Sequence, residues 1–140
     1  MKKARDIMTP GTEFASVDET IEQAAKRMAK LDVGALPICN NQERLQGMLT
    51  DRDIAVKVVA AGKDPKKTKV GDVAQGTEVV TIGADDSIDE ALRTMKDKKV
   101  RRLPVIDGRQ VVGIISQGDL ATNLPEDKVG DLVEAISAAP

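Results

Sequence analysis

Two segments of the chain carry a hydroxyl residue and a carboxylate at the same spacing, each after a short apolar run. They are GMLTDRD at Gly47–Asp53 and GIISQGD at Gly113–Asp119. A hydroxyl residue followed three positions later by Asp can cap a helix, because both side chains bind unpaired backbone groups. The same groups can hold a nucleotide, since a helix start favours phosphate and a carboxylate accepts both hydroxyls of a ribose. Both interpretations stay open, because a ligand can use the donors that a cap leaves over.

A glycine opens each of these segments. Gly47 and Gly113 stand three residues before the hydroxyl residue, where the absence of a side chain would let a ligand approach the backbone. We therefore expect a ligand to lie against the strand that leads into each helix.

The composition excludes several kinds of chemistry. The chain has 140 residues, no histidine and one cysteine, Cys39. A zinc site of nitrogen and sulfur ligands, a Ser-His or Cys-His nucleophile and an intrachain disulfide therefore lack the residues they need. We interpret Cys39 as a buried strand thiol, with a redox sensor as the alternative. A cytoplasmic protein without covalent catalysis is the expectation.

The charge and the aromatic content argue against nucleic-acid binding. The net charge is −2, whereas a sequence-independent binder needs a basic face. Phe14 is the sole aromatic residue, so stacking platforms for single strands are absent. A basic stretch, Lys63–Lys69, leaves nucleic-acid binding as an alternative. No run of apolar residues approaches the length of a membrane span.

The chain is a duplicated unit. Pro37 in ALPIC corresponds to Pro104 in RLPVI, and residues on both sides match in the same order. The matched pairs are Ile21 with Ile88, Ala24 with Ala91, Met28 with Met95, Gly47 with Gly113, Thr50 with Ser116 and Asp53 with Asp119. Each half is therefore one copy of a supersecondary unit.

Each copy predicts the same order of elements. Thr20 and Ser87 each stand three residues before Gln or Glu, a capping box, and apolar residues at helical spacing follow. Two strand-like runs joined by a turn come next, and a second helix begins at residue 51 or 117. The predicted order is strand, helix, strand, strand, helix, so the fold class is mixed α/β.

The repeats divide the chain into four parts. We predict a first domain at 1–61, a linker at 62–69, a second domain at 70–123 and a helical tail at 124–140. Val129, Leu132, Val133 and Ile136 give the tail one apolar face. We expect this helix to pack on the module or on a partner subunit. Its acidic polar face disfavours the alternative of a membrane surface.

The repeated pattern resembles two cystathionine-β-synthase-type (CBS) domains. The resemblance rests on TIEQA, GALPI and LQGMLTDRDI in the first copy, and on SIDEAL, RRLPVI and VVGIISQGDL in the second. It covers residues 1 to about 123. It implies two β-α-β-β-α repeats packed with pseudo-two-fold symmetry, clefts for adenosyl ligands (AMP, ADP, ATP, S-adenosylmethionine or NAD) and flat homodimers.

The resemblance also implies the residues of two sites. Asp53 and Asp119 would hold ribose, and Thr50 and Ser116 would contact phosphate or ribose. The other candidates are the backbone beside Leu36, Pro37, Leu103 and Pro104 at the adenine edge, and Arg52, Arg101 and Arg102 against phosphate. At the cleft wall they are Ser16 and Val17 in the first copy and, as their counterparts in the second, Thr81 and Ile82.

The positions of these arginines differ between the copies. The first copy has Gly34-Ala35 where the second has Arg101-Arg102, and Asp51-Arg52 where the second has Gln117-Gly118. Arg101 and Arg102 follow several lysines, so a solvated charged run is an equal alternative to a phosphate contact. We predict that the two clefts bind nucleotide unequally.

The leading hypothesis is a non-enzymatic adenine-nucleotide sensor that acts through an unknown effector protein. One alternative is a ligand-independent structural or interaction dimer, in which Thr50 and Ser116 serve only as helix caps. An enzyme is a further alternative, for which the available carboxylates and lysines show no paired arrangement. The sequence identifies neither the adenosyl ligand nor the effector.

Overall fold

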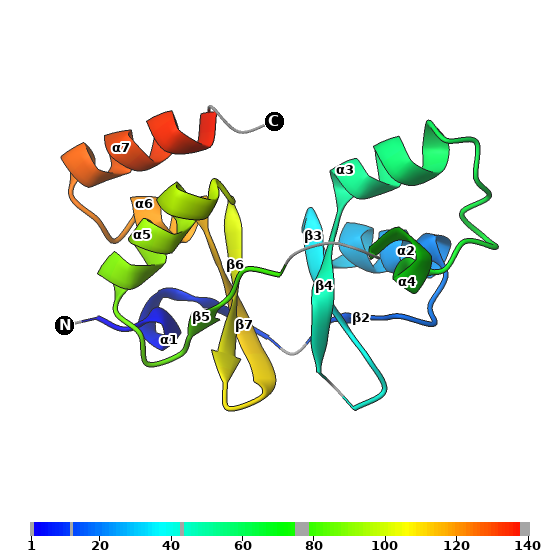
Figure 1. Cartoon of the computed structure of the whole chain (residues 1–140), viewed down its shortest axis with the longest axis horizontal. Coiled ribbons are helices and arrows are strands. Elements are labelled where there is room, and N and C mark those ends of the chain that lie inside the picture. The colour runs from blue at the N-terminus through cyan, green and yellow to red at the C-terminus, as the bar shows by residue number, and fades with distance from the viewer. Residues whose placement is uncertain (1, 12, 43, 75–78, 138–140) are drawn as a thin grey trace. The chain divides into compact units, whose positions relative to one another are not determined.

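The computed structural model describes residues 2–11, 13–42, 44–74 and 79–137. The chain forms two compact units. The first-repeat unit comprises the described residues of 13–79, and the second-repeat unit comprises those of 1–12 and 80–140 (Figure 1). The compact units thus differ from the sequence repeats, because the start of the chain packs with the second repeat and the stretch after residue 61 packs with the first.

The first-repeat unit is a three-stranded sheet with helices. Its sheet has the order β2-β3-β4, with β2 parallel to β3 and β3 antiparallel to β4. Strand, helix, strand, strand, helix is the predicted order, and it is confirmed. The elements are β2 (Ala15–Ser16), α2 (Ile21–Leu31), β3 (Ala35–Cys39), β4 (Leu45–Thr50), α3 (Asp51–Asp53), the π-helical segment η1 (Ile54–Val59) and α4 (Val70–Ala74).

The second-repeat unit repeats this arrangement and adds an element at each end of the chain. Its sheet has the order β1-β7-β6-β5, in which β5 is parallel to β6 and β7 is antiparallel to both of its neighbours. The elements are α1 (Ala4–Ile7), β1 (Thr9–Pro10), β5 (Ile82–Gly83), α5 (Ile88–Lys98), β6 (Arg102–Asp107), β7 (Gln110–Ser116), α6 (Gln117–Ala121) and α7 (Glu126–Ser137).

The two long repeat helices begin at the predicted caps. Thr20 accepts a hydrogen bond from the Gln23 amide at 3.2 Å, and the Gln23 side chain accepts from the Thr20 amide at 3.0 Å. Ser87 accepts from the Glu90 amide at 3.2 Å, whereas the Glu90 carboxylate pairs with Arg93. The capping box is therefore complete on α2, and the serine caps α5.

The second helix of the first repeat is wider than the predicted α-helix. After three residues of α3 the chain forms the π-turns of η1, with a hydrogen bond from the Ala60 amide to the Ala55 carbonyl at 2.9 Å. The corresponding helix of the second repeat, α6, ends at Ala121. The two copies therefore diverge directly after the hydroxyl–Asp motif.

Each unit has its own apolar core. Ile21, Ala24 and Met28 of α2 pack with Leu36, Ile38 and Leu49 of the sheet. In the second-repeat unit, Met95, Leu103 and Ile115 pack with Leu132 and Ile136 of α7.

The predicted C-terminal helix is confirmed, and it packs on α5 and α6 of the second-repeat unit. Lys128 adds an ion pair to Asp89 at 3.1 Å.

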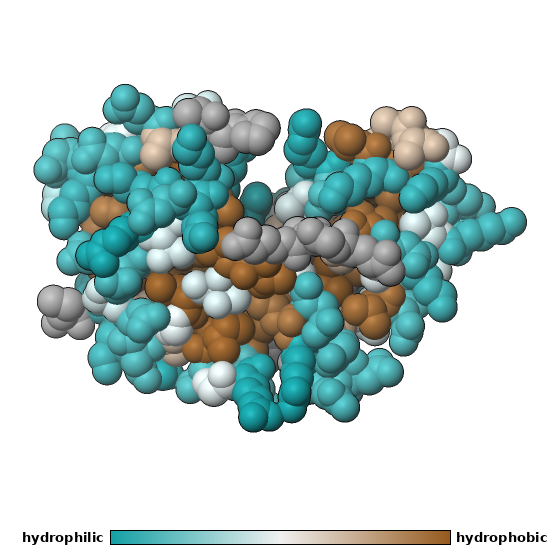
Figure 2. All heavy atoms as spheres, viewed as in Figure 1, coloured by the Kyte–Doolittle hydropathy of each residue, from teal (hydrophilic) through white to brown (hydrophobic). Residues whose placement is uncertain are grey.

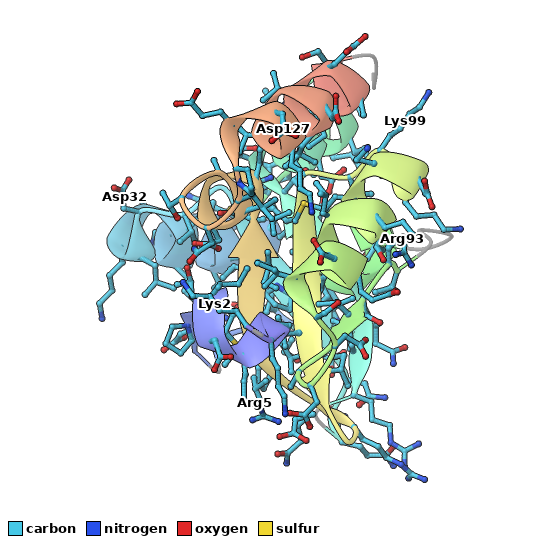
Figure 3. All side chains as sticks on the ribbon, turned by 90° about the vertical axis from the view of Figure 1, so that its left-hand side faces the viewer. Lys2, Arg5, Asp32, Arg93, Lys99 and Asp127 are labelled. Atoms are coloured by element: carbon cyan, nitrogen blue, oxygen red, sulfur yellow. The ribbon has the colours of Figure 1, made fainter. Side chains whose placement is uncertain are left out.

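The N-terminal segment is held by the second-repeat unit. The Ala4 amide donates to the Asp86 carbonyl at 2.8 Å, and β1 pairs with β7. Arg5, labelled on α1 in Figure 3, binds Asp85 at 2.9 Å and Asp107 at 3.4 Å. The hydrogen bond from Arg5 holds the pKa of Asp85 below its ordinary value. These contacts make the first residues part of the second sheet.

Candidate functional site

The first candidate motif lies where β4 runs directly into α3. Thr50 has an extended backbone, and its hydroxyl accepts a hydrogen bond from the Asp53 amide at 3.1 Å. Asp53 Oδ2 accepts in return from the Thr50 amide at 3.0 Å. The capping-box interpretation is therefore confirmed here. The Asp53 side chain is still 23% exposed, so a cap of this kind leaves part of the carboxylate accessible.

The second motif has the same geometry where β7 runs into α6. The Ser116 hydroxyl accepts from the Asp119 amide at 3.2 Å, and Asp119 Oδ2 accepts from the Ser116 amide at 2.8 Å. The Ser116 hydroxyl also donates to the same Oδ2 at 3.1 Å. Both copies thus place a hydroxyl and a carboxylate side by side at the end of a strand.

The strand next to each motif places the adenine-edge candidates in register. Ala35 pairs with Thr50, and Leu36 and Pro37 follow it along β3. The Leu36 and Pro37 side chains are buried, so only their backbone can meet a ligand. Among the described residues, β2 pairs with β3 only at Ile38 and Cys39, which leaves the other edge of Leu36 outside the sheet ladder. Leu103 and Pro104 have the equivalent positions in β6, beside Ile115 and Ile114.

The cleft-wall candidates are not equivalent in the two copies. Ala15 pairs with Ile38, and Ile82 pairs with Val105, the residue that corresponds to Ile38. Ile82 therefore corresponds to Ala15, and the match that we expected of Thr81 and Ile82 with Ser16 and Val17 is displaced by two residues. The displacement arose because these two-residue strands carry too little pattern to fix their register.

The first-copy members of this group lie far from the motif. Ser16 pairs with Cys39 at one end of β3, whereas Thr50 pairs with Ala35 at the other. The Val17 carbonyl already accepts a hydrogen bond from Gly71 at 2.9 Å. Within the first-repeat unit, Ser16 and Val17 are therefore not brought together with Thr50 and Asp53.

The arginines of the second copy lie beside its motif. Arg102 pairs with Ser116 in the sheet, and the Arg101 carbonyl accepts from the Gln117 amide at 3.0 Å. Arg101 is exposed and Arg102 is half-buried. In the first copy the cation is Arg52, an exposed residue of α3. The expected change in the place of the positive charge is therefore visible within each unit.

The interpretation of the two glycines is wrong for Gly113. A side chain at this position would meet Met8 Sδ at 2.6 Å and the Thr9 carbonyl at 2.7 Å. Gly113 therefore makes room for the N-terminal segment, which pairs with β7 there as strand β1, and not for a ligand. Gly47 has only ordinary contacts, with Ala74 at 3.7 Å and Ile38 at 3.8 Å. The sequence signal was real, but its cause is a contact between distant parts of the chain.

Two surface cavities of about 330 Å³ lie outside the hydroxyl–Asp pairs, although one of them reaches Asp51, between Thr50 and Asp53. One lies between α2 and the start of η1 and is lined by Ala25, Met28, Ala29, Asp32, Val33, Asp51 and Ile54. The other lies between α5 and α7 and is lined by Asp89, Leu92, Arg93, Lys96, Asp97 and Lys128. Neither includes Thr50, Asp53, Ser116 or Asp119.

Burial and packing describe the positions of the remaining candidates. Cys39 is buried in β3, as expected of a strand thiol. The basic stretch packs on the start of α2, because the Ile21 amide donates to the Thr68 carbonyl at 2.9 Å. Within the described ranges, no three histidine, cysteine or acidic residues are grouped so that they could hold a metal ion. No helix of the described part is long and apolar enough to cross a membrane.

Comparison with known proteins gives a consistent result over nearly the whole chain. Residues 4–60 and 70–126 each match the model of the CBS domain. The chain is 44% identical over 136 residues to hypoxic response protein 1 of Mycobacterium tuberculosis, covering 97% of this chain and 94% of the relative.

Two solved structures resemble the fold described above. The crystal structure of hypoxic response protein I with two coordinated zinc ions has a TM-score of 0.80 and 44% identity, covering 89% of this chain and 100% of that chain. The CBS domain pair of protein MJ0100, in complex with 5′-methylthioadenosine and S-adenosyl-L-methionine, has a TM-score of 0.73 and 26% identity. That match covers 88% of this chain and 95% of that one.

Proposed function

Because the chain belongs to the CBS domain family, we propose that it is a regulatory module that binds an adenosyl ligand and acts through a protein partner. The observation that carries this proposal is the duplicated motif. Thr50 with Asp53 and Ser116 with Asp119 present the same hydroxyl and carboxylate at the ends of β4 and β7.

The chemistry of each motif suits a nucleoside. A carboxylate can accept hydrogen bonds from both hydroxyls of a ribose, and the unpaired strand edge beside Leu36 or Leu103 can bind the edge of adenine. With no aromatic side chain at the motif, aliphatic residues would contact the base. The adenosyl ligands in the structure of protein MJ0100 support this class of ligand.

The arginines indicate where a phosphate would lie. Arg101 and Arg102 at the start of β6 stand next to Ser116, and Arg52 stands between Thr50 and Asp53 in the sequence. A guanidinium group binds phosphate oxygens with two parallel hydrogen bonds. A ligand with phosphates, such as AMP, ADP or ATP, would therefore gain more from the second copy, which has two arginines.

We propose no catalytic role and no zinc site. The chain has no histidine, and its one cysteine is buried in β3. The zinc ions of hypoxic response protein I therefore do not fit the residues present here, since Cys and His are the usual ligands of zinc in closed sites.

A homodimer is part of the proposal. Figure 2 shows hydrophobic surface over the helical region at upper right, where η1 lies in Figure 1. Val56 and Val59 of η1 are 48% and 65% exposed, and Val33 beside α2 is 43% exposed. In the second-repeat unit α7 packs on α5, and Leu92 and Met95 of α5 lie in the same core as Leu132 and Ile136 of α7. Light scattering of the variant with both Val33→Asp and Val59→Asp tests this assignment by a change from dimer to monomer mass.

A ligand-independent interaction module is the second candidate. The observation that favours it is that both carboxylates are already used as caps, with complete capping boxes. On this account Asp53→Ala and Asp119→Ala would each cost only the stability of a cap, about 1 kcal/mol, and no nucleotide would stabilise the protein.

Thermal unfolding of nucleotide-stripped protein separates the two candidates. AMP, ADP, ATP, S-adenosylmethionine and NADH are added in turn to the wild type, Asp53→Ala and Asp119→Ala. A ligand at a hundredfold excess over its Kd adds about 2.7 kcal/mol, a shift of several degrees. The Asp51→Ala variant is the control, because it removes a neighbouring carboxylate outside the capping box.

The proposal predicts that at least one ligand raises the midpoint and that an aspartate variant loses part of that response. No response to any of the five ligands at millimolar concentration contradicts it and favours the interaction module.

A further inference from the structure

The two motif carboxylates differ in what surrounds them. Asp53 Oδ2 accepts from the Thr50 amide, and Asp53 Oδ1 forms an ion pair with Lys57 at 3.4 Å. Both oxygens of Asp53 are therefore engaged. On Asp119, both hydrogen bonds from Ser116 go to Oδ2. Among the described residues, no lysine or arginine lies within ion-pair distance of Asp119.

The spacing of the two residues favours this ion pair. Lys57 is the fourth residue after Asp53 and lies within η1. Residues four apart are neighbours on a helix surface, so an ammonium group at i+4 reaches a carboxylate at i.

The second copy has a neutral residue at the equivalent position. Asn123 is the fourth residue after Asp119, and its amide donates to the Asp119 backbone carbonyl at 2.8 Å. Its side-chain oxygen accepts from Lys2, labelled near α1 in Figure 3, at 2.9 Å. Asn123 is therefore held by the backbone and by the N-terminal segment. Because its side chain is neutral, it places no positive charge beside Oδ1, the outer carboxylate oxygen of Asp119.

We propose that Lys57 competes with the ribose diol for Asp53, so that the first-repeat site is the weaker of two adenosyl sites. This inference rests on the proposed function. The two hydroxyls of a ribose must donate to the carboxylate oxygens, and at Asp53 they must first displace the ammonium group. At Asp119 the outer oxygen is ready to accept. Lys57 is a specificity-determining residue, because a ligand with phosphate gives the displaced ammonium a new partner and a ligand without phosphate does not.

The direct test measures each site alone with 5′-methylthioadenosine, an adenosyl compound without phosphate. Isothermal titration of Lys57→Asn in an Asp119→Ala background reports the first-repeat site. Asn123→Lys in an Asp53→Ala background reports the second. Exposed ion pairs of this kind correspond to about two- to fivefold in an equilibrium constant. We expect Lys57→Asn to raise the affinity by this factor and Asn123→Lys to lower it.

Two further variants separate competition from a general effect on structure or charge. Lys57→Arg keeps the positive charge over Asp53 and is expected to retain the lower affinity. Lys26→Asn removes the same charge and breaks a matched ion pair on α2, Lys26 with Glu22 at 3.2 Å, away from the motif. It is expected to leave the affinity of the first-repeat site unchanged.

Several outcomes overturn the inference. They are an unchanged or lowered affinity in Lys57→Asn, an equal gain in Lys26→Asn, and binding of the probe at neither isolated site. The proposed function is judged separately by the thermal series with AMP, ADP and ATP. A response there with no effect of Lys57 rejects this inference alone.

Discussion

In the first-repeat unit the helix after Thr50 widens into a π-turn, whereas in the second-repeat unit the helix after Ser116 ends at Ala121 and the chain returns as α7. The two strand-to-helix junctions share the same pair of capping-box hydrogen bonds. The difference teaches that duplication preserved the local cap while the surroundings changed. In the first copy Lys57 lies beside the carboxylate of Asp53. In the second copy α7 covers the apolar face of α5.

The packing of α7 on α5 gives the largest expected effect on stability. Leu132 of α7 is fully buried in the second-repeat core, whereas Val133 beside it is 42% exposed. Leu132→Ala is expected to lower the free energy of unfolding by about 2–5 kcal/mol, because it leaves a cavity in the core. Val133→Ala is the matched control. Urea unfolding followed by circular dichroism measures both, and equal, small losses would show that α7 is not part of the core.

The two glycines give a paired test of the next size. In Gly113→Ala the new methyl group would meet Met8 and the Thr9 carbonyl at under 3 Å, whereas Gly47→Ala would meet only ordinary contacts. We expect Gly113→Ala to cost about 1–3 kcal/mol, a typical cost of overpacking. Gly47→Ala is expected to change stability much less. Similar unfolding midpoints for the two variants would contradict the different roles assigned to these positions.

The two caps are expected to be close in strength. Thr50→Ala and Ser116→Ala each remove a hydroxyl that accepts a hydrogen bond from the amide of the Asp three residues later, at a cost of about 1 kcal/mol. Ser116→Ala also removes the hydrogen bond to Asp119 Oδ2, so its loss should be the larger of the two. Denaturant titration gives both values. A larger loss in Thr50→Ala would indicate that the π-turn depends on its cap more than α6 does.

The smallest effect concerns the ion pair between Arg5 of α1 and Asp85 in the second-repeat unit. The pKa of Asp85 lies below its ordinary value of 3.8 because of the Arg5 hydrogen bond. A lowered folded-state pKa adds stability above the unfolded value, and this stability is lost as the pH falls through the folded value. Asp85→Asn should therefore have a slightly lower midpoint than the wild type at pH 7. The difference should disappear at pH values well below 3.8, as thermal unfolding across this range will measure.

The features that sequence predicted are those that depend on neighbours along the chain. The capping boxes at Thr20, Thr50 and Ser116 involve residues three positions apart, so the pattern contains both partners. The repeat order and the amphipathic C-terminal helix follow from the spacing of apolar residues. These local rules were sufficient for the fold class and for the geometry of both motifs.

The features that it missed depend on contacts between distant residues. Nothing near Gly113 indicates that Met8 and Thr9 will lie against it, and a two-residue strand such as β5 cannot fix its own register. The π-turn of η1 has no composition signal either, since DRDIAVKVV reads as an ordinary helix. The arginines predicted unequal sites, and a comparison of Lys57 with Asn123 would have added a second difference, because the repeat alignment places both four residues after the motif aspartate.

The most direct test of the whole account is the number of adenosyl ligands bound per chain. Equilibrium titration of nucleotide-stripped protein with S-adenosylmethionine is compared among the wild type, Asp53→Ala, Asp119→Ala and the double variant, each checked for its fold by circular dichroism. The account predicts two unequal sites in the wild type, with loss of the weaker site in Asp53→Ala, loss of the stronger site in Asp119→Ala and no binding in the double variant. Undiminished binding in the double variant would show that the motifs are only helix caps and that the ligand is held elsewhere.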